Sequence, residues 1–546
     1  MGTIGQGTCE KPVSDSLFAD AAEAPKLPGP IERALSAGLV VVFCCALVFA
    51  LAGVFLTTLG FDEAWILQGF EGLSSSRSQG AAVAPPTTSG GLFAVTNMIV
   101  QELGGSRLWA HRMLSWLCLL GICWVVVRWG PRERSRRLSA LIPAVMVVGV
   151  PGTLFLGASA YASTHALLLF LLTLQSMQIP TRGIRKWIVC GVLAGLTAAT
   201  RTEYIFGIAG IALYLALRKG DWRRRLADSA TVAAVGAVTA FACMAILQYS
   251  SPALGPSRLV WATGVTSYLW NYPAILNKWL VGNSNFVLPL AAISSVAAWA
   301  MDRDLVPSAR GRWTILVVVG WLIWLAWLIR SPFPHLRYVW PSLASFAIVA
   351  GFGLARLHEW GASTGNAAAR IASLGIAIAY AGSGLGATAR SILQGDSNII
   401  VAESSGTAAF DYFRRFQHVR DQWATVDYIK KAFAPDEKLG IIGADRELSY
   451  LSGKRLQVLI DYPSDEITHA DLPRRILVPS GTYYSLSRAG RNWIEGNCEL
   501  EAQFGRYSFY KVVGDFPPPP FVFARGGNES RSVSPLSKIS AGTIQE

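Results

Sequence analysis

Long apolar runs follow one another along the first 390 residues, and they constrain the fold of this chain more than any other feature. The first run, from Leu35 to Leu59, contains no charged residue. A run of this length is typical of a transmembrane helix, because about 20 apolar residues cross the hydrocarbon core of a bilayer. We therefore predict a polytopic α-helical membrane protein with about eleven spans. The further runs lie at roughly 108–127, 138–156, 160–178, 187–200, 203–217, 229–248, 286–301, 313–329, 339–355 and 371–389.

The composition agrees with a chain embedded in lipid. Hydrophobic residues make up 52% of the sequence and charged residues only 15%. A net charge of +13 could suggest nucleic acid as a partner, but the Lys and Arg residues fall in short clusters between the apolar runs. If the spans alternate in direction, these clusters all lie on one side, which predicts that this side is cytoplasmic. We therefore expect a lipid bilayer and no nucleic acid as the environment of this chain.

The same pattern divides the chain into segments. Residues 1–34 are predicted to be a mostly disordered cytoplasmic tail, and residues 35–390 a transmembrane domain with outer loops at 60–107 and 249–285. Within the first loop, the amphipathic stretch from Leu92 to Leu103 predicts a helix that lies in the membrane interface. Residues 391–516 are predicted to form a small periplasmic α/β domain, and residues 517–546, with four consecutive prolines, a disordered tail.

The α/β domain is predicted from its own periodicity. The spacing of Trp423, Val426, Ile429 and Phe433 predicts an amphipathic helix. Further helices are expected around Glu447 and Trp493, and strands at 439–442, 456–460, 476–478 and 507–513. The domain contains no glycine-rich phosphate loop and no nucleophile elbow, so we assign it no catalysis; it is either a lid or acceptor-binding unit, or a stabilising cap.

Two adjacent carboxylates, Asp62 and Glu63, directly follow the first span. Charge at a membrane edge is costly unless it faces a polar cavity or a partner, so such a pair is a functional hypothesis. Asp62 is the candidate general base, which would activate an acceptor hydroxyl or amine. Glu63 would orient the acceptor or hinder ionisation of Asp62, because two neighbouring acids resist double ionisation. The alternative is that the pair only ends the helix in water.

Several short motifs, taken in order, resemble the GT-C glycosyltransferases that use polyprenyl-phosphate-linked sugars. This group includes protein O-mannosyltransferases and the lipid A aminoarabinose transferases. The resemblance covers about the first 390 residues and rests on the conjunction of motifs, none of them specific alone. The motifs are Asp62-Glu63 after the first span, Pro85-Pro86 with the interfacial helix, Arg112-Met113-Leu114-Ser115, Thr200-Arg201-Thr202-Glu203, and Arg337-Tyr338 followed by Pro341.

The resemblance implies a function and a set of roles. It implies an inverting glycosyltransferase that moves a hexose or pentose from a polyprenyl-phosphate carrier to an envelope glycolipid, polysaccharide or protein. The active site would face the periplasm of a bacterial inner membrane. Asp62 would be the general base, and the leaving phosphate would meet Arg112, Arg201 and Arg337, since guanidinium groups suit bidentate phosphate contact. Snorkelling to the interface is the alternative role for each arginine.

For each of the remaining candidate residues, a purely structural role explains the sequence as well as a role in the active site does. Tyr161, His165 and Tyr338 are candidate cavity residues, although tyrosines also anchor at interfaces and a lone histidine near a span end is often structural. Glu203 is expected to pair with Arg201. The chain has Ala84 where many members have a histidine before the two prolines, so the contacts that this histidine makes in those members, to a metal or to other groups, are not expected from this position. The sequence therefore shows no certain cofactor and leaves open whether a divalent metal takes part.

Two other function classes fit a protein with many spans. A transporter or flippase for a lipid-linked sugar would show internal repeats and ionisable groups near the bilayer midplane. The sequence shows no clear similarity between its halves, and its charges cluster at one rim. A non-catalytic membrane assembly protein would need neither the carboxylate pair nor the arginines.

Overall fold

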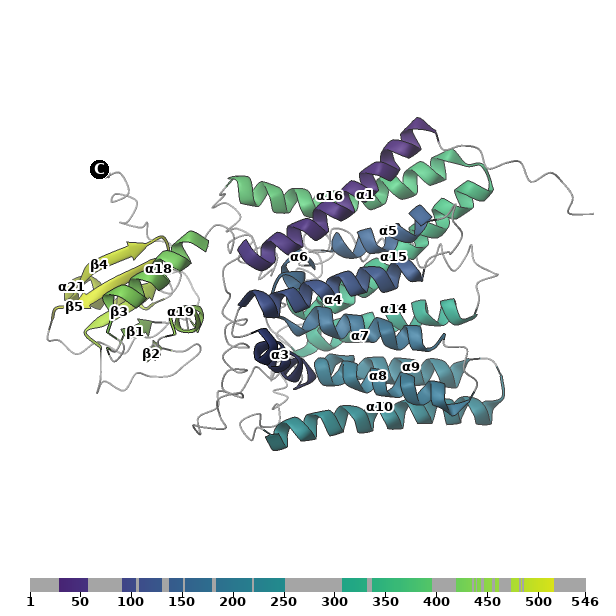
Figure 1. Cartoon of the computed structure of the whole chain (residues 1–546), viewed down its shortest axis with the longest axis horizontal. Coiled ribbons are helices and arrows are strands. Elements are labelled where there is room, and N and C mark those ends of the chain that lie inside the picture. Colours follow the sequence, from purple (N-terminus) through teal and green to yellow (C-terminus); the bar gives the residue numbers. More distant parts are fainter. Residues whose placement is uncertain are drawn as a thin grey trace, which may run out of the picture.

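The computed structural model describes residues 29–56, 91–104, 108–129, 137–150, 153–178, 183–218, 220–250, 307–330 and 336–394, and most of 419–514 (Figure 1). Predictions for Asp62, Glu63, the outer loop at 249–285, the run at 286–301 and the segments 1–28 and 515–546 lie outside the described residues. The two described parts are a bundle of apolar helices and a C-terminal sheet covered by helices.

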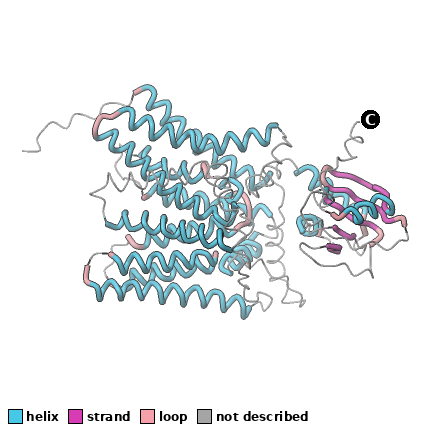
Figure 2. Tube along the Cα trace, turned by 180° about the vertical axis from the view of Figure 1, so that it is seen from behind, coloured by secondary structure: helices cyan, strands magenta, loops and turns pink. Residues whose placement is uncertain are grey.

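The bundle consists of long helices that run side by side, as the apolar runs predict (Figure 2). A helix satisfies every interior backbone group within its own segment, which makes it the stable form of an apolar chain in lipid. The helices are α1 (Pro30–Leu56), α3 (Gly91–Gly104), α4 (Leu108–Arg128), α5 (Arg137–Val148), α6 (Thr153–Gly157), α7 (Ala162–Ser176), α8 (Ile184–Thr200), α9 (Ile205–Leu217), α10 (Trp222–Ser250), α14 (Pro307–Arg330), α15 (Leu336–Ser363) and α16 (Ala367–Gln394).

Four described helices are long and apolar enough to cross a membrane by length and composition: Pro30–Phe55, Leu108–Arg128, Trp222–Ala245 and Trp340–Ser363. Other apolar helices, among them α7 and α9, are shorter. Helix α3 occupies the stretch predicted to lie in the interface, and it contacts α4, α8 and α10.

One predicted span is wrong. The run at 138–156 was predicted to be a single helix, but α5 ends at Val148 and α6 begins at Thr153. The sequence between them contains Gly149, Pro151 and Gly152, and proline and glycine both interrupt helices. The hydroxyl of Thr153 donates to the carbonyl oxygen of Val147 (2.9 Å), which gives a partner to one of the carbonyl groups at the end of α5.

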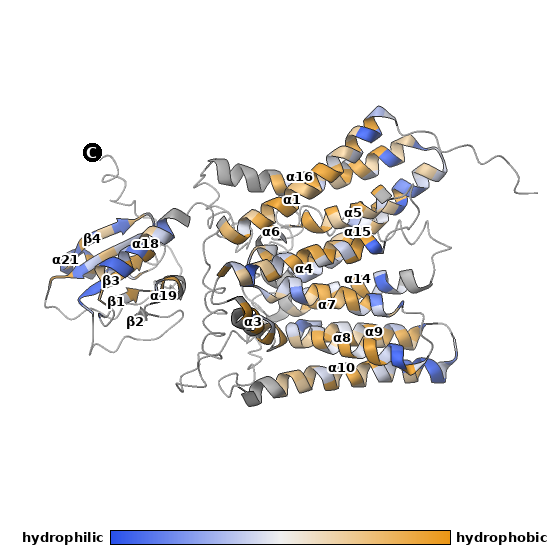
Figure 3. Ribbon diagram, in the orientation of Figure 1, coloured by the Kyte–Doolittle hydropathy of each residue, from blue (hydrophilic) through white to orange (hydrophobic). Residues whose placement is uncertain are grey.

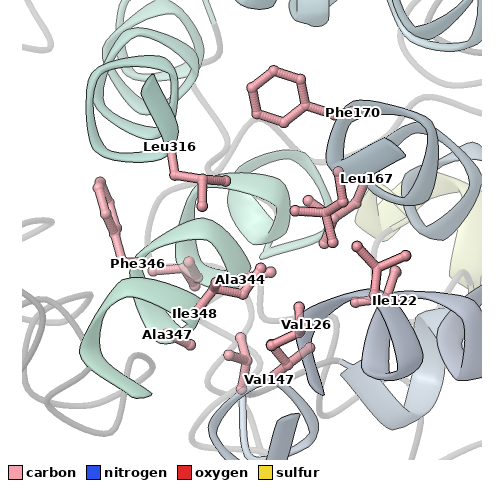
Figure 4. Close-up of a cluster of buried hydrophobic side chains, with 14 of the residues drawn as sticks. Ile122, Val126, Val147, Leu167, Phe170, Leu316, Ala344, Phe346, Ala347 and Ile348 are labelled. Carbon is pink, nitrogen blue, oxygen red and sulfur yellow. The ribbon is translucent and has the colours of Figure 1, made fainter. Parts of the chain in front are cut away.

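One large cluster of buried apolar side chains forms the hydrophobic core of the bundle. Side chains from α4, α5, α7, α14 and α15 meet there (Figure 4), among them Ile122, Val147, Leu167, Leu316 and Phe346. A Cβ atom added to Gly195 would lie 2.5 Å from the carbonyl oxygen of Gly236, so α8 packs directly on the backbone of α10. This close contact fixes the position of α8.

The two ends of the bundle differ in charge. Arginines gather at one end, where α4 and α9 finish and α10 begins, and Figure 3 shows polar residues concentrated at that end. We call this the basic end and define it by Arg128, Arg218, Arg312, Arg356 and Arg370. We call the opposite end, where α3 lies, the α3 end. The described basic clusters therefore follow the one-sided distribution that the sequence predicts.

The C-terminal part is a five-stranded mixed sheet with the strand order β2-β1-β3-β5-β4. Strand β1 (Leu439–Ile442) pairs in parallel with β2 (Gln457–Ile460) and β3 (Arg475–Pro479). Strand β5 (Tyr507–Val512) pairs antiparallel with β3 and β4 (Cys498–Phe504). Apolar residues of α18 (Val419–Ala432) pack with α19 (Arg446–Ser452) on one face of the sheet, and α21 (Arg488–Asn497) packs on the other.

These elements lie where the sequence predicts helices and strands, with one exception. Strand β4 was not predicted, because most of its residues are exposed and it includes Glu499 and Glu501. A mostly exposed edge strand lacks the apolar alternation by which a half-buried strand is recognised.

Candidate active site

The Thr-Arg-x-Glu motif forms a turn between α8 and α9 at the α3 end. Helix α8 ends at Thr200, and Arg201 adopts extended backbone angles (φ −148°, ψ 119°) before a single 3₁₀ turn, Thr202–Tyr204. The amide of Arg201 still donates to the carbonyl oxygen of Thr197 (3.0 Å), which ties the turn to the helix. The turn therefore places Arg201 and Glu203 close together on a fixed piece of backbone.

Glu203 holds the guanidinium of Arg201 from one side. The Nη2 and Nε atoms of Arg201 donate to Glu203 Oε1 at 2.7 and 3.2 Å, and Nε lies 3.3 Å from Oε2. The two residues form a buried ion pair, and Arg201 is only 5% exposed. The predicted pairing of Glu203 with Arg201 is confirmed. Charge-assisted contacts of this kind fix the plane of the guanidinium.

The first turn of α7 approaches the same guanidinium. Arg201 Nη1 donates to the hydroxyl oxygen of Ser163, and α7 places His165 two residues further on. His165 Nδ1 lies 3.2 Å from the carbonyl oxygen of Tyr161. A carbonyl oxygen can only accept, so Nδ1 carries the proton, and Nε2 of the neutral ring is a proton acceptor. Nε2 is buried and has no hydrogen-bond partner within the described part of the chain.

Helix α3 connects α7 to α4 at this end. The ring of Phe93 meets the ring of His165 edge-on, with centroids 4.9 Å apart and an interplanar angle of 75°. One turn later, Asn97 donates through Nδ2 to the carbonyl oxygen of Phe93 (2.9 Å), and its Oδ1 lies 3.0 Å from His111 Nδ1. The amide oxygen is the acceptor in this last contact, so His111 Nδ1 donates. Both histidines are therefore oriented by α3.

Arg112 follows His111 and is 1% exposed. Its Nη1 donates to the carbonyl oxygen of Val54 (3.3 Å), close to the end of α1. The last carbonyl groups of a helix lack partners within the helix, and a cation there interacts favourably with the helix dipole. Arg112 therefore stabilises the end of α1, the helix that precedes Asp62 and Glu63 in the sequence. A phosphate-binding role for Arg112 stays a prediction.

The other predicted residues have less structural detail. Tyr161 is buried immediately before α7, where its carbonyl oxygen accepts from His165. Arg337 and Tyr338 lie in the first turn of α15, and only their backbone is described. The beginning of α15 is tied to α6 by Trp340, whose Nε1 donates to Thr153 Oγ1 (2.8 Å). The roles of Tyr161, Arg337 and Tyr338 also stay predictions.

Several functional candidates were not found from the sequence. Ser163 contacts Arg201, and three more polar atoms of residues close to Ser163 or Arg201 in the sequence are buried without a hydrogen-bond partner in the described residues: Ser159 Oγ, Thr164 Oγ1 and Tyr204 OH. A buried polar atom without a partner is costly, so each of these atoms is a candidate contact for water or a ligand. The available signal was the polar cluster Ser159, Ser163 and Thr164 between two apolar runs, together with Tyr204 next to the Arg-x-Glu motif.

The described residues include no group of three or more His, Cys, Asp or Glu side chains that could hold a metal ion.

Comparisons with known proteins bear on the fold. No protein-family model matches the sequence, and no curated protein matches it. Among solved structures, the chain is similar to ArnT from Cupriavidus metallidurans bound to undecaprenyl phosphate, with 17% identity, a TM-score of 0.54, and coverage of 88% of this chain and 99% of ArnT. The chain has a GT-C fold.

Two other GT-C structures are more distant. For the Archaeoglobus fulgidus oligosaccharyltransferase, solved with zinc and sulfate, the TM-score is 0.43, the identity 11% and the coverage 86% of this chain and 73% of that chain. For the arabinosyltransferase EmbB from Mycobacterium smegmatis, the TM-score is 0.36 and the identity 12%, and the match covers 76% of this chain and 42% of EmbB.

The likeness to ArnT carries the fold assignment, and it confirms the resemblance predicted from the sequence motifs. Together with the long apolar helices, the GT-C fold establishes an integral membrane protein.

Proposed function

We propose that this chain is a glycosyltransferase that moves a sugar from a polyprenyl-phosphate carrier to an acceptor of the cell envelope. The observation that carries the proposal is the buried arginine centre at the α3 end, in which Glu203 and Ser163 fix Arg201. The GT-C fold supports it, because ArnT has that fold and was solved with undecaprenyl phosphate bound.

The chemistry needs three elements. A base must take a proton from the acceptor, positive charge must stabilise the leaving phosphate, and water must be excluded from an oxocarbenium-like transition state. Arg201 fits the second role because its guanidinium is already oriented and largely dry, so little reorganisation is needed when phosphate charge develops. Arg112 and Arg337 are proposed to share this role. Direct displacement by the activated acceptor would invert the anomeric carbon.

Asp62 is proposed as the base and Glu63 as its partner in orienting the acceptor. His165 offers a second proton acceptor, since the proton on Nδ1 leaves Nε2 free to accept. Tyr161 and Tyr338 are proposed to line the sugar-binding region. The acceptor is proposed to be a glycolipid, polysaccharide or protein on the outer face of a bacterial inner membrane. The N-terminal tail would then be cytoplasmic and the C-terminal α/β domain periplasmic.

The test compares the wild-type protein with Asp62→Asn in proteoliposomes that contain lipid-linked sugars and an envelope extract. The measured quantity is the release of free polyprenyl phosphate. Asparagine keeps the shape of the side chain but cannot accept the proton, so we expect a loss of about a hundredfold or more. Asp427→Asn is the matched control, because Asp427 is exposed on α18 in the C-terminal sheet domain, and it should release at the wild-type rate.

The outcomes separate the alternatives. Unchanged release by Asp62→Asn would transfer the base role to Glu63 or His165. Movement of the lipid-linked sugar across the bilayer without release of polyprenyl phosphate would favour a transporter or flippase. Neither movement nor release, with the correct donor present, would favour an assembly protein.

A further inference from the structure

Arg312 is a buried arginine at the basic end, in the second turn of α14, and it belongs to no part of the candidate active site. Its side chain is 4% exposed, and its Nε and Nη1 atoms are buried without a hydrogen-bond partner in the described part of the chain. The Cζ atom lies 4.5 Å from the centroid of the Trp129 ring. The described contact of this cation is therefore with an aromatic face.

Three other arginines of the basic end have carboxylate partners, and the remaining one, Arg128, has its Cζ atom 4.7 Å from the centroid of the Trp124 ring. Arg218 pairs with Asp228, Arg356 with Glu359 (2.8 Å) and Arg370 with Glu32 (3.4 Å). For Arg312, no ion pair is present among the described residues. Among the described residues, three arginines at this end therefore have an internal counter-charge, whereas Arg128 and Arg312 have a ring contact and no ion pair. Arg128 is exposed to solvent, so Arg312 is the buried member of this pair.

The aromatic surroundings of Arg312 are themselves fixed. Trp129 donates through Nε1 to Gln175 Oε1 at the end of α7, which anchors its ring. Phe352 of α15 stacks on Trp129 (6.2 Å, 20°) and on Trp313 (5.3 Å, 21°). Three helices and the residue that follows α4 therefore hold one rigid aromatic platform beneath the guanidinium.

This arrangement is costly without an anion. A guanidinium removed from water loses solvation free energy, and a cation–π contact returns only a small part of that loss. A phosphate group suits the unpartnered edge, because the donors of arginine are spaced for bidentate contact with phosphate oxygens. Phosphates of phospholipids lie at the level of the membrane interface, where tryptophans are also enriched.

We propose that Arg312 binds the phosphate of an anionic phospholipid from the leaflet at the basic end, with Trp129 as the platform. This site is distinct from the candidate active site. Arg112 at the start of α4 and Trp129 directly after its end are 17 residues apart in the sequence. A helix rises 1.5 Å per residue, so the two sites are separated by about 25 Å. The lipid would stabilise the junction of α4, α14 and α15.

The test uses the purified full chain in a neutral detergent, delipidated and then titrated with phosphatidylglycerol. Native mass spectrometry counts bound lipid, and thermal unfolding measures the stabilisation that binding produces. We expect Arg312→Gln to weaken binding of the tightest lipid about 10-fold or more, because a hydrogen bond to a charged group contributes about 1.5–3 kcal/mol. Arg312→Lys keeps the positive charge but loses the two parallel N–H donors of the guanidinium, so an intermediate loss of lipid affinity is expected.

Arg223→Gln is the matched control. Arg223 is exposed at the start of α10, and its Cζ lies 5.6 Å over the ring of Trp222. It therefore has the same charge and the same kind of ring contact without the burial. This variant should bind phosphatidylglycerol as tightly as the wild type. Phosphatidylcholine is expected to bind more weakly than phosphatidylglycerol, since its headgroup carries no net charge.

Inorganic phosphate distinguishes the source of the anion. Stabilisation by phosphatidylglycerol but not by inorganic phosphate supports a lipid site. Equal stabilisation by both would overturn the lipid assignment and identify a free anion as the ligand of Arg312. Equal phosphatidylglycerol binding by the wild type and Arg312→Gln would overturn the site. If Arg312→Gln does not fold, the same comparison with Arg312→Lys decides, and wild-type affinity there would overturn the proposal.

Discussion

Arg201 at the α3 end and Arg312 at the basic end are about equally buried, but their side chains contact different groups. Arg201 is 5% exposed and is held by the carboxylate of Glu203 and the hydroxyl of Ser163. Arg312 is 4% exposed and lies over the ring of Trp129 with two nitrogen atoms unpartnered among the described residues. The described part of the chain therefore gives Arg201 a carboxylate partner and gives Arg312 none.

The difference bears on what each end can do. A guanidinium fixed by a carboxylate on one edge is oriented before any ligand arrives, which is what stabilisation of a developing charge requires. A guanidinium on an aromatic platform has no counter-charge to exchange, which suits a permanently bound anion. We therefore expect the α3 end to respond to substitution in both stability and activity, and the basic end mainly in stability and lipid binding.

The largest effect is expected for Glu203→Gln. This substitution leaves Arg201 buried without its carboxylate partner, and breaking a buried ion pair costs about 3–5 kcal/mol of unfolding free energy. The double variant Arg201→Met/Glu203→Gln removes both charges and should recover much of that loss. Denaturant unfolding of both variants in detergent measures the difference. A double variant less stable than Glu203→Gln would show that Arg201 is held mainly by its other contacts.

A smaller effect, on rate rather than stability, is expected for His165→Asn. The amide of asparagine can still donate to the carbonyl oxygen of Tyr161, as Nδ1 of His165 does, but the Nε2 acceptor is lost. If Nε2 takes part in proton transfer, the rate of polyprenyl phosphate release should fall about a hundredfold. Unfolding free energy should fall by about 0.5–1.5 kcal/mol, because the edge-on contact between the His165 and Phe93 rings is lost.

His165→Gln controls for hydrogen bonding at the Nε2 position. Glutamine places a polar atom there that can accept a hydrogen bond but cannot take a proton. Equal losses in His165→Asn and His165→Gln support proton transfer, whereas recovery in His165→Gln would limit His165 to a hydrogen-bonding role. Wild-type rates in both variants would remove His165 from the chemistry.

The sequence revealed the contacts made between near neighbours and missed those made between distant elements. The pairing of Arg201 with Glu203 was predictable, because the two residues are only two positions apart at a short link between spans and few other partners are near in the sequence. Ser163 contacts Arg201 across 38 positions, and Asn97 contacts His111 across 14, through a helix whose packing no periodicity reports. These contacts depend on which helices become neighbours.

The basic end shows the same limit. The sequence identified Arg312 only as one member of a basic cluster that indicates membrane sidedness. Its guanidinium lies over Trp129, on which Phe352 stacks, and these two rings come from two other regions of the chain. The prediction of a single helix at 138–156 was wrong for a different reason. It followed the overall apolarity of the run and gave too little weight to the glycines and the proline between α5 and α6. Element type was thus readable from composition, but interruptions and contacts were not.

A modest effect is expected for Glu359→Gln at the basic end. Glu359 accepts from the hydroxyl of Ser139 (3.1 Å) and pairs with Arg356, whose side chain is 38% exposed. Solvent screens the pair through Arg356, and glutamine can still accept from Ser139, so the loss should be about 1 kcal/mol or less. Denaturant unfolding of Glu359→Gln and Glu203→Gln under the same conditions compares their losses of unfolding free energy directly. Equal losses in the two variants would mean that the two ends do not differ in how they hold their charges.

The smallest disturbance comes from labelling Cys498, which tests which end of the bundle faces outwards. Cys498 lies at the start of β4, and burial raises the pKa of its thiol to about 11. Only the thiolate reacts, so labelling by a membrane-impermeant alkylating reagent should be slow at neutral pH and accelerate as the pH rises towards 11. Since an unfolded thiol ionises near pH 8.5, burial of Cys498 favours folding below that pH, and this contribution declines as the pH rises through 11.

Ser363→Cys supplies the opposite reporter, because Ser363 is exposed at the end of α15, at the basic end. With the proposed orientation, intact cells of this variant should show label on Cys498 and none on the thiol introduced at the end of α15. Lysis should expose both thiols, and peptide mass spectrometry locates the label. The reverse pattern would place the basic end outside and the α3 end in the cytoplasm. The candidate active site would then draw its lipid-linked donor from the cytoplasmic leaflet, and the anionic lipid of Arg312 would have to come from the outer one.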